Sequence, residues 1–200
     1  MQAAHIGETL SQARTTVKGQ SRGKTATMES FSPYLAGFFD GDGSLHFQIV
    51  RQKQYRFGFY IRASLVFYQA TPCEAGLIAI GNELGVGRLR RRSGGMSDLT
   101  ITNRDAIRAV LDRMKPYVIF KREQVERGLA LLDRLPPPRD RVGFLRVCEA
   151  VDDFASLNFS KSRTVTTATV RSAWRGMGVV VPVTTDPRWR DGDQCPTWQI

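Results

Sequence analysis

One short acidic segment, Asp40-Gly41-Asp42-Gly43, stands out in an otherwise basic first half of the chain. Carboxylates bind hard divalent cations, and such cations activate water and stabilise leaving oxygens in phosphodiester cleavage. An EF-hand calcium loop starting at Asp40 would need glycine at its sixth position and glutamate at its twelfth. Those positions hold Leu45 and Arg51, so the EF-hand interpretation fails. A purely structural helix end remains the alternative to a metal site.

The segment before these carboxylates has the pattern of a buried helix. Ser32-Pro33 is typical of a helix start, with serine as N-cap and proline at the first helical position. From Tyr34 onward the apolar residues point around most of the helix, and glycines indicate its end. Gly37 and Gly41 lie four apart on one face, where a second helix can approach closely. Such pairing in a dimer would bring two terminal carboxylates together.

The following residues predict two β-hairpins and a helix between them. Period-two alternation at 45–52 and 59–69 indicates strands with one core face and one mostly polar face. Thr71-Pro72-Cys73-Glu74 matches a capping box, and the helix that it starts is expected to close at Gly85. A second hairpin is expected between about 88 and 102. Further helices are predicted near 104–115, 121–135, 141–157 and 168–175.

The charge of the chain points to a polyanionic partner. Lys and Arg number 29 against 19 Asp and Glu, which gives a net charge of +10 and a pI near 10.1. Nucleic acid and an anionic membrane surface both fit such an excess. The membrane is disfavoured, because the positive charge lies on predicted strands and no apolar run approaches the roughly 18 residues of a membrane span.

Length and cysteine content narrow the class further. Two hundred residues suit one compact domain with loose ends. We expect this domain at 30–176, a flexible basic tail at 1–29 and a C-terminal tail at 177–200. The three cysteines are far apart and odd in number, which argues against a disulfide framework, and with only two histidines besides them a Cys/His zinc site is excluded. Any metal must therefore be held by oxygen ligands.

The stretch from Tyr34 to Ser44 resembles the signature of the LAGLIDADG homing endonucleases. The resemblance extends from about Phe31 to Met177, in the manner of the single-motif, I-CreI-type members. It implies a mixed α/β (α+β) fold of order αββαββα, with a saddle-shaped antiparallel sheet backed by helices. It also implies a homodimer that makes a double-strand break in a long, roughly palindromic DNA site. The other similar segments are Gly85-Val86-Gly87, Pro116 to Gln124, Phe144 to Asp152, Asn158 to Arg163 and Thr169-Val170-Arg171.

The resemblance also assigns the chemistry to particular residues. It implies that Asp42 binds the catalytic metal with help from the carbonyl of Gly41, and that the metal is Mg²⁺, with Mn²⁺ or Ca²⁺ able to occupy the same sites. Gln69 and Lys121 would order the attacking water and stabilise phosphate charge. Taken without the resemblance, these two residues favour a solvated surface. Cys73 departs from the family, which carries an arginine there.

The polar faces of both hairpins are expected to contact DNA. Arginine can bond guanine bidentately and glutamine can bond adenine, while tyrosine and serine adapt to either. A solvated sheet face is the alternative. Ser160, Lys161 and Arg163 are expected to contact the phosphate backbone. The full set of predicted DNA contacts is Gln48, Gln52, Gln54, Tyr55, Tyr60, Arg62, Ser64, Tyr68, Arg88, Arg90, Arg92, Thr100, Ser160, Lys161 and Arg163.

One motif per chain implies self-association, since there is no second copy of the motif. Two rival functions stay open: a maturase that binds intron RNA, and a non-cleaving DNA-binding regulator on the same fold. The compartment is open between an organelle and a bacterial cytoplasm. The predicted dimer interface consists of Leu35, Ala36, Gly37, Phe38, Asp40 and Gly41.

Overall fold

The structure is a computed structural model that describes residues 28–158, 163–178 and 180–181. The order αββαββα, followed by further helices, agrees with the predicted mixed fold. The tails predicted at 1–29 and 177–200 lie almost wholly outside the described residues. The elements are α1 (Met28–Asp42), β1 (Gly43–Arg51), β2 (Phe59–Ala70), the 3-10 turn η1 (Thr71–Cys73), α2 (Glu74–Leu84), β3 (Arg88–Arg91), β4 (Met96–Ile101), α3 (Arg104–Met114), α4 (Arg122–Asp133), α5 (Arg141–Phe154), the 3-10 turn η2 (Ala155–Asn158) and α6 (Thr167–Gly176).

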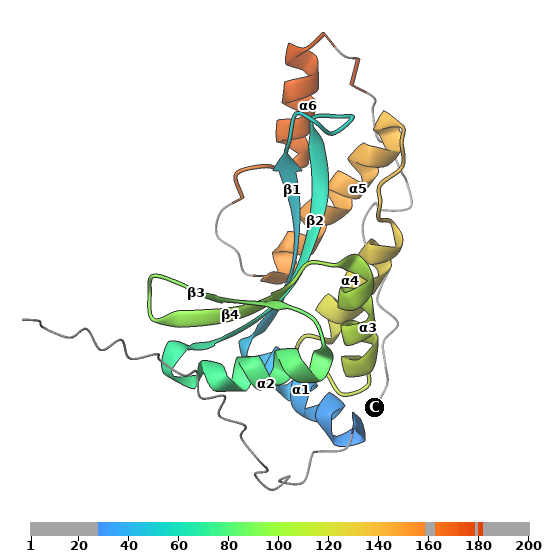
Figure 1. Ribbon diagram of the computed structural model, residues 1–200. Coiled ribbons are helices and arrows are strands. Elements are labelled where there is room, and N and C mark those ends of the chain that lie inside the picture. Colours follow the sequence, from blue (N-terminus) through green and yellow to red (C-terminus); the bar gives the residue numbers. More distant parts are fainter. Residues whose placement is uncertain (1–27, 159–162, 179, 182–200) are drawn as a thin grey trace, which may run out of the picture.

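Four antiparallel strands form one sheet in the order β1-β2-β4-β3. Leu45 pairs with Leu65, and Phe67 pairs with Leu99, so apolar side chains line up on one face. The two hairpins run in clearly different directions, which gives the sheet its curvature (Figure 1). Helices α1 to α5 pack against the apolar face of the sheet. The predicted saddle backed by helices is confirmed.

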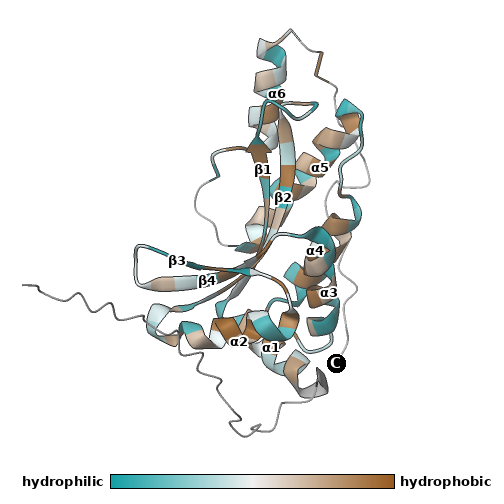
Figure 2. Ribbon diagram, viewed as in Figure 1, coloured by the Kyte–Doolittle hydropathy of each residue, from teal (hydrophilic) through white to brown (hydrophobic). Residues whose placement is uncertain are grey.

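The core lies between this apolar sheet face and the helices. Strand residues of alternate parity are buried there, as the period-two pattern predicted. In contrast, β3 and its turn are hydrophilic (Figure 2). Within the described residues, no helix has the length and apolar character needed to cross a membrane. The largest fully buried side chains include Trp174, Phe39, Phe47, Phe67 and Phe144.

Helix α1 starts earlier than the sequence pattern indicated. It begins at Met28, so Pro33 lies inside the helix rather than at its first position. The N-cap predicted at Ser32 is therefore wrong. Because only about one turn precedes Pro33, the missing proline N–H removes a single hydrogen bond near the helix end. The helix ends at Asp42, as expected.

Helix α2 ends as predicted but starts differently. Gly85 adopts the left-handed conformation, with φ of 65°, and closes the helix. The predicted capping box is wrong, because Thr71 forms a 3-10 turn and makes no side-chain cap. The Glu74 carboxylate instead accepts hydrogen bonds from Arg91 Nε at 2.9 and 3.0 Å and from the Ser97 hydroxyl at 2.9 Å. A tertiary ion pair has replaced the local cap.

Gly43 allows the chain to pass directly from α1 into β1. A Cβ at this position would lie 2.6 Å from Phe39 Cα and 2.8 Å from Phe39 O, both backbone atoms of the last helical turn. No side chain fits there without moving the helix relative to the strand. The end of α1, with Asp42 on it, is thus placed at a defined point of the sheet.

We predict that Gly43→Ala lowers the free energy of unfolding by about 1–3 kcal/mol, since the added methyl group must displace the Phe39 backbone. Gly76→Ala is the matched control, because a Cβ at this exposed position of α2 meets no atom within 4 Å. It should leave stability unchanged or raise it by up to about 1 kcal/mol. Denaturant unfolding measures both variants. Equal stabilities for the two would contradict this account of the junction.

Candidate active site and nucleic-acid interface

The carboxylate predicted to bind metal stands exposed at the C-terminal end of α1. Asp42 makes no hydrogen bond or ion pair within the described part of the chain. The last carbonyls of a helix lack intrahelical partners, and that of Gly41 is one of them. The helix dipole adds partial negative charge at the same end. Oxygen donors concentrated in this way suit a hard divalent cation.

Lys121 lies against this helix end. Its Nζ donates to the carbonyl oxygens of Gly43 at 2.7 Å and Phe39 at 2.9 Å, and it lies 3.4 Å from Gly41 O. Burial lowers the pKa of Lys121, while the carboxylates of Asp40 and Asp42 act in the opposite direction. The structure thus brings together three predicted site residues, namely Asp42, Gly41 and Lys121.

Asp40 fixes the position of Lys121, a role that the sequence did not reveal. Its carboxylate accepts backbone hydrogen bonds from Ile119 at 2.7 Å, Phe120 at 3.3 Å and Lys121 at 2.9 Å. Three such bonds hold the segment before α4 on α1. Asp40 stays a predicted dimer contact, with its carboxylate engaged by its own chain.

The other two predicted positions lie at the end of β2 and just beyond it. Gln69 Oε1 accepts from the N–H of Ala70 at 2.9 Å, and Gln69 is not hydrogen-bonded to Asp42 or Lys121 within the described chain. Cys73 is exposed in η1. Among the described residues, no group of three His, Cys, Asp or Glu side chains is placed to hold a metal. Among the described residues at this helix end, the site therefore offers the exposed carboxylate of Asp42 together with backbone oxygens.

The predicted contacts of the first hairpin share the sheet face that lies away from the core. Arg62 donates to Gln48 Oε1 at 2.7 Å, and both side chains are exposed. At the hairpin end the rings of Tyr55 and Tyr60 stack with centroids 4.7 Å apart. Ser64 lies on the same face, opposite His46 of β1. In the turn of the same hairpin, Gln52 Nε2 donates to Gln54 Oε1 at 2.5 Å.

The second hairpin carries a buried carboxylate on the same polar face. Asp98 is 0% exposed and accepts hydrogen bonds from Arg92 Nε at 2.5 Å, from Thr100 at 2.6 Å and from Arg90 at 3.2 Å. Burial raises the pKa of the Asp98 carboxyl, but the bonds from Thr100, Arg92 and Arg90 outweigh it, so the pKa is lowered. The sequence analysis did not identify Asp98 as a functional residue. Its carboxylate orients Arg90 and Arg92, two predicted DNA contacts.

Tyr68 connects the two hairpins across this face. Its hydroxyl lies 3.3 Å from His46 Nε2, and the guanidinium of Arg92 lies 5.4 Å from the centre of its ring. Arg88 is exposed at the register position opposite Thr100. The predicted row of arginines thus lies on the polar face next to Tyr68.

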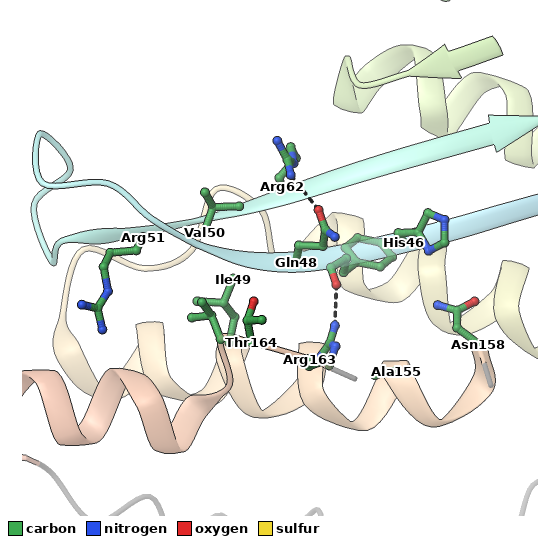
Figure 3. A pocket seen from close by; sticks show the side chains of 12 residues that line it. His46, Gln48, Ile49, Val50, Arg51, Arg62, Ala155, Asn158, Arg163 and Thr164 are labelled. Atoms are coloured by element: carbon green, nitrogen blue, oxygen red, sulfur yellow. Dashed lines mark hydrogen bonds between the residues drawn. The ribbon is translucent and has the colours of Figure 1, made fainter. Parts of the chain in front are cut away.

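Arg163, a predicted phosphate contact, is held by its own chain. Its guanidinium donates to Phe47 O at 2.5 Å, to Val151 O at 2.9 Å and to Asp152 at 3.0 Å. Figure 3 shows this side chain directed at the outer edge of β1. Arg163 satisfies an edge carbonyl and ties α5 to the sheet. Ser160 and Lys161 lie outside the described residues.

The predicted dimer face of α1 divides into two groups. Leu35 and Ala36 are 0% exposed and belong to the core, so their side chains cannot reach a partner, which corrects that prediction. Gly37 and Gly41 are exposed, and a Cβ on either would meet no atom within 4 Å. Phe38 is half-buried and stacks on Phe67, with ring centroids 5.9 Å apart.

Comparison with known proteins places this arrangement in one class. Residues 35–125 match the LAGLIDADG endonuclease family. The chain is 31% identical over 148 residues to the DNA endonuclease I-CvuI of Chlorella vulgaris, which covers 74% of this chain and 92% of that protein. It is 34% identical over 145 residues to the DNA endonuclease I-CreI of Chlamydomonas reinhardtii, covering 72% and 88% respectively.

Comparison of the fold with solved structures supports the same family. A crystal structure of the homing endonuclease I-CvuI superposes with a TM-score of 0.70 and 30% identity, over 76% of this chain and 96% of that one. The chain therefore belongs to the LAGLIDADG endonuclease family, as its motif predicted.

We predict that Asp98→Asn lowers the selectivity for the specific DNA duplex more than it lowers DNA affinity. The substitution frees Arg90 and Arg92 and removes a negative charge from the polar face, so the affinity for a scrambled duplex should stay the same or rise. The ratio of specific to non-specific affinity should therefore fall about tenfold. The unfolding free energy should drop by about 1–3 kcal/mol. Fluorescence anisotropy on both duplexes measures the ratio.

Asp112→Asn, at an exposed position on α3, controls for the change in net charge and should leave the ratio unaltered. An unchanged ratio in the Asp98 variant would show that the two arginines do not depend on this carboxylate.

Proposed function

We propose that this protein is a site-specific homing endonuclease that acts as a homodimer and cuts both strands of a long, pseudo-palindromic DNA site. The observation that carries the proposal is the end of α1, where the exposed Asp42 carboxylate stands beside the Gly41 carbonyl and the Lys121 ammonium. I-CvuI has been crystallised on DNA in the presence of Mg, with the DNA not cleaved, and in the presence of Ca. A nuclease role for Asp42 separates this function from that of a non-cleaving regulator.

A divalent cation fits the donors at this helix end. Asp42 and Gly41 offer a carboxylate and a carbonyl oxygen, which Mg²⁺, Mn²⁺ and Ca²⁺ all accept. When bound, the cation would supply an activated water and neutralise the leaving oxygen. Lys121 adds a positive charge, already fixed by backbone oxygens, for a non-bridging phosphate oxygen. Gln69, at the end of β2, would order the attacking water.

The homodimer follows from what one subunit lacks. Each chain brings a single exposed carboxylate to the helix end, because Asp40 is engaged by three backbone N–H groups. Pairing α1 with its symmetry mate across Gly37 and Gly41 would place two Asp42 carboxylates together. Next to α1, Ile119 and Phe120 are 71% and 86% exposed, as expected for apolar residues that a partner covers.

The polar sheet face supplies the DNA contacts. Exposed Arg62 with Gln48, and Arg90 and Arg92 held on Asp98, present donors in fixed positions that suit major-groove edges. Two subunits related by a twofold axis would read the two halves of a nearly symmetric site. Intron RNA is the second candidate partner for the same basic surface.

We predict that Asp42→Asn lowers the rate of double-strand cleavage at least about a hundredfold while binding persists, because the metal loses its carboxylate ligand. A target is first selected with the wild-type protein from a randomised DNA library in Mg²⁺, and EDTA should stop its cleavage. Asp105→Asn removes a carboxylate that is 81% exposed on α3 and should cut at the wild-type rate. Cleavage that persists in the Asp42 variant would overturn the assignment of the metal ligand.

We predict that Gly37→Leu converts the dimer to a monomer, since four added carbon atoms keep the two α1 helices apart. Gly76→Leu adds the same group at an open position on α2 and should stay dimeric. Sedimentation velocity measures the mass of each. A Gly37 variant with unchanged dimer mass would contradict this geometry, as would a wild-type protein that stays monomeric on DNA.

A further inference from the structure

His46 occupies the polar face between the helix end and the predicted reading residues. It lies on β1, four positions after Asp42, which ends α1, and its register partner on β2 is Ser64. Two residues further along β1, Gln48 pairs with Arg62. Alternate residues of a strand share a face, so His46 points to the same side as Gln48. Figure 3 shows both on β1, His46 nearer to the start of the strand.

One ring nitrogen of His46 is held and the other is open. Nε2 lies 3.3 Å from the Tyr68 hydroxyl, and Tyr68 in turn lies beneath Arg92, which binds Asp98. This chain of contacts crosses β1, β2 and β4 and holds the Nε2 edge of the imidazole. Nδ1 has no hydrogen-bond partner within the described residues. A half-buried ring with one free polar atom has a defined direction in which to accept or donate.

The charge state of His46 limits what it can contact. Burial lowers the pKa of His46, and the positive charges of Arg92 and Arg163 lower it further, so the ring is neutral at pH 7 and above. A neutral imidazole contributes no counterion release at a phosphate, whereas a single well-placed donor or acceptor suits a base edge. The surroundings thus favour base recognition over backbone binding.

We infer that His46, positioned by Tyr68, is a specificity-determining residue that contacts the base pair lying between the scissile phosphate and the pairs contacted by Gln48 and Arg62. This inference rests on the proposed function, because it assumes that the polar face binds DNA. It concerns a residue that neither the strand pattern nor the family motif distinguishes, since alternation places many polar residues on that face.

The test is a selection of bound duplexes from a randomised library in Ca²⁺, so that it depends on binding and not on cleavage. His46→Ala should reduce the base preference about tenfold at one symmetric pair of positions, closer to the centre than those changed by Arg62→Ala. Tyr68→Phe, a conservative change that removes only the hydroxyl, should alter preference at the same pair. The slope of log affinity against log salt should stay that of the wild type.

Three results would overturn the inference. One is a base preference unchanged at every position in both variants. Another is a loss spread evenly over all positions, which would mark His46 as purely structural. The third is a salt slope reduced in magnitude by about one per subunit, which would mark a phosphate contact. Failure of cleavage in Mg²⁺ would instead count against the proposed nuclease, and the binding selection would still decide on His46.

Discussion

The structure depends on the way one helix end is tied to a distant segment. The carbonyls at the C-terminus of α1 bind the ammonium of Lys121, and the Asp40 carboxylate binds the backbone of the three residues that end at Lys121. These bonds join residues about eighty positions apart. These bonds do not involve Asp42, which ends the helix two residues after Asp40 and is exposed. Two acids two residues apart thus serve opposite purposes, one bound within the chain and the other open to a ligand.

On the polar sheet face, too, a buried carboxylate orients side chains that remain exposed to a ligand. Asp98 is buried beneath Arg90 and Arg92, so each arginine has a fixed direction before any DNA is bound. An arginine held in advance loses less conformational entropy on binding than a free one. Under the proposed function, the Asp98 carboxylate would also oppose non-specific attraction to phosphate on a chain of net charge +10. The expected result is a lower overall affinity with a higher selectivity.

The sequence predicted those features that depend on local periodicity. The alternation from Leu45 and from Phe59 gave the hairpin, and Gly85 gave the end of α2. Features that depend on partners distant in the chain were not predictable. Nothing in the sequence around Asp40 indicates that its carboxylate accepts three backbone hydrogen bonds. Arg163 lies in a polar, basic segment typical of a phosphate contact, but its guanidinium bonds a carbonyl at the sheet edge. Leu35 and Ala36 matched the motif, but the opposite side of α1 is the exposed one.

In the proposed mechanism, two copies of Asp42 meet across paired α1 helices and hold metal beneath the scissile phosphates. Anomalous scattering from Mn²⁺ in a crystal of the wild-type protein on its selected DNA tests this most directly. Mn²⁺ peaks are expected within coordination distance of the Asp42 carboxylates of both subunits, with Gly41 carbonyl oxygens beside them. Peaks located elsewhere, or Asp42 copies too far apart to share a site, would contradict it.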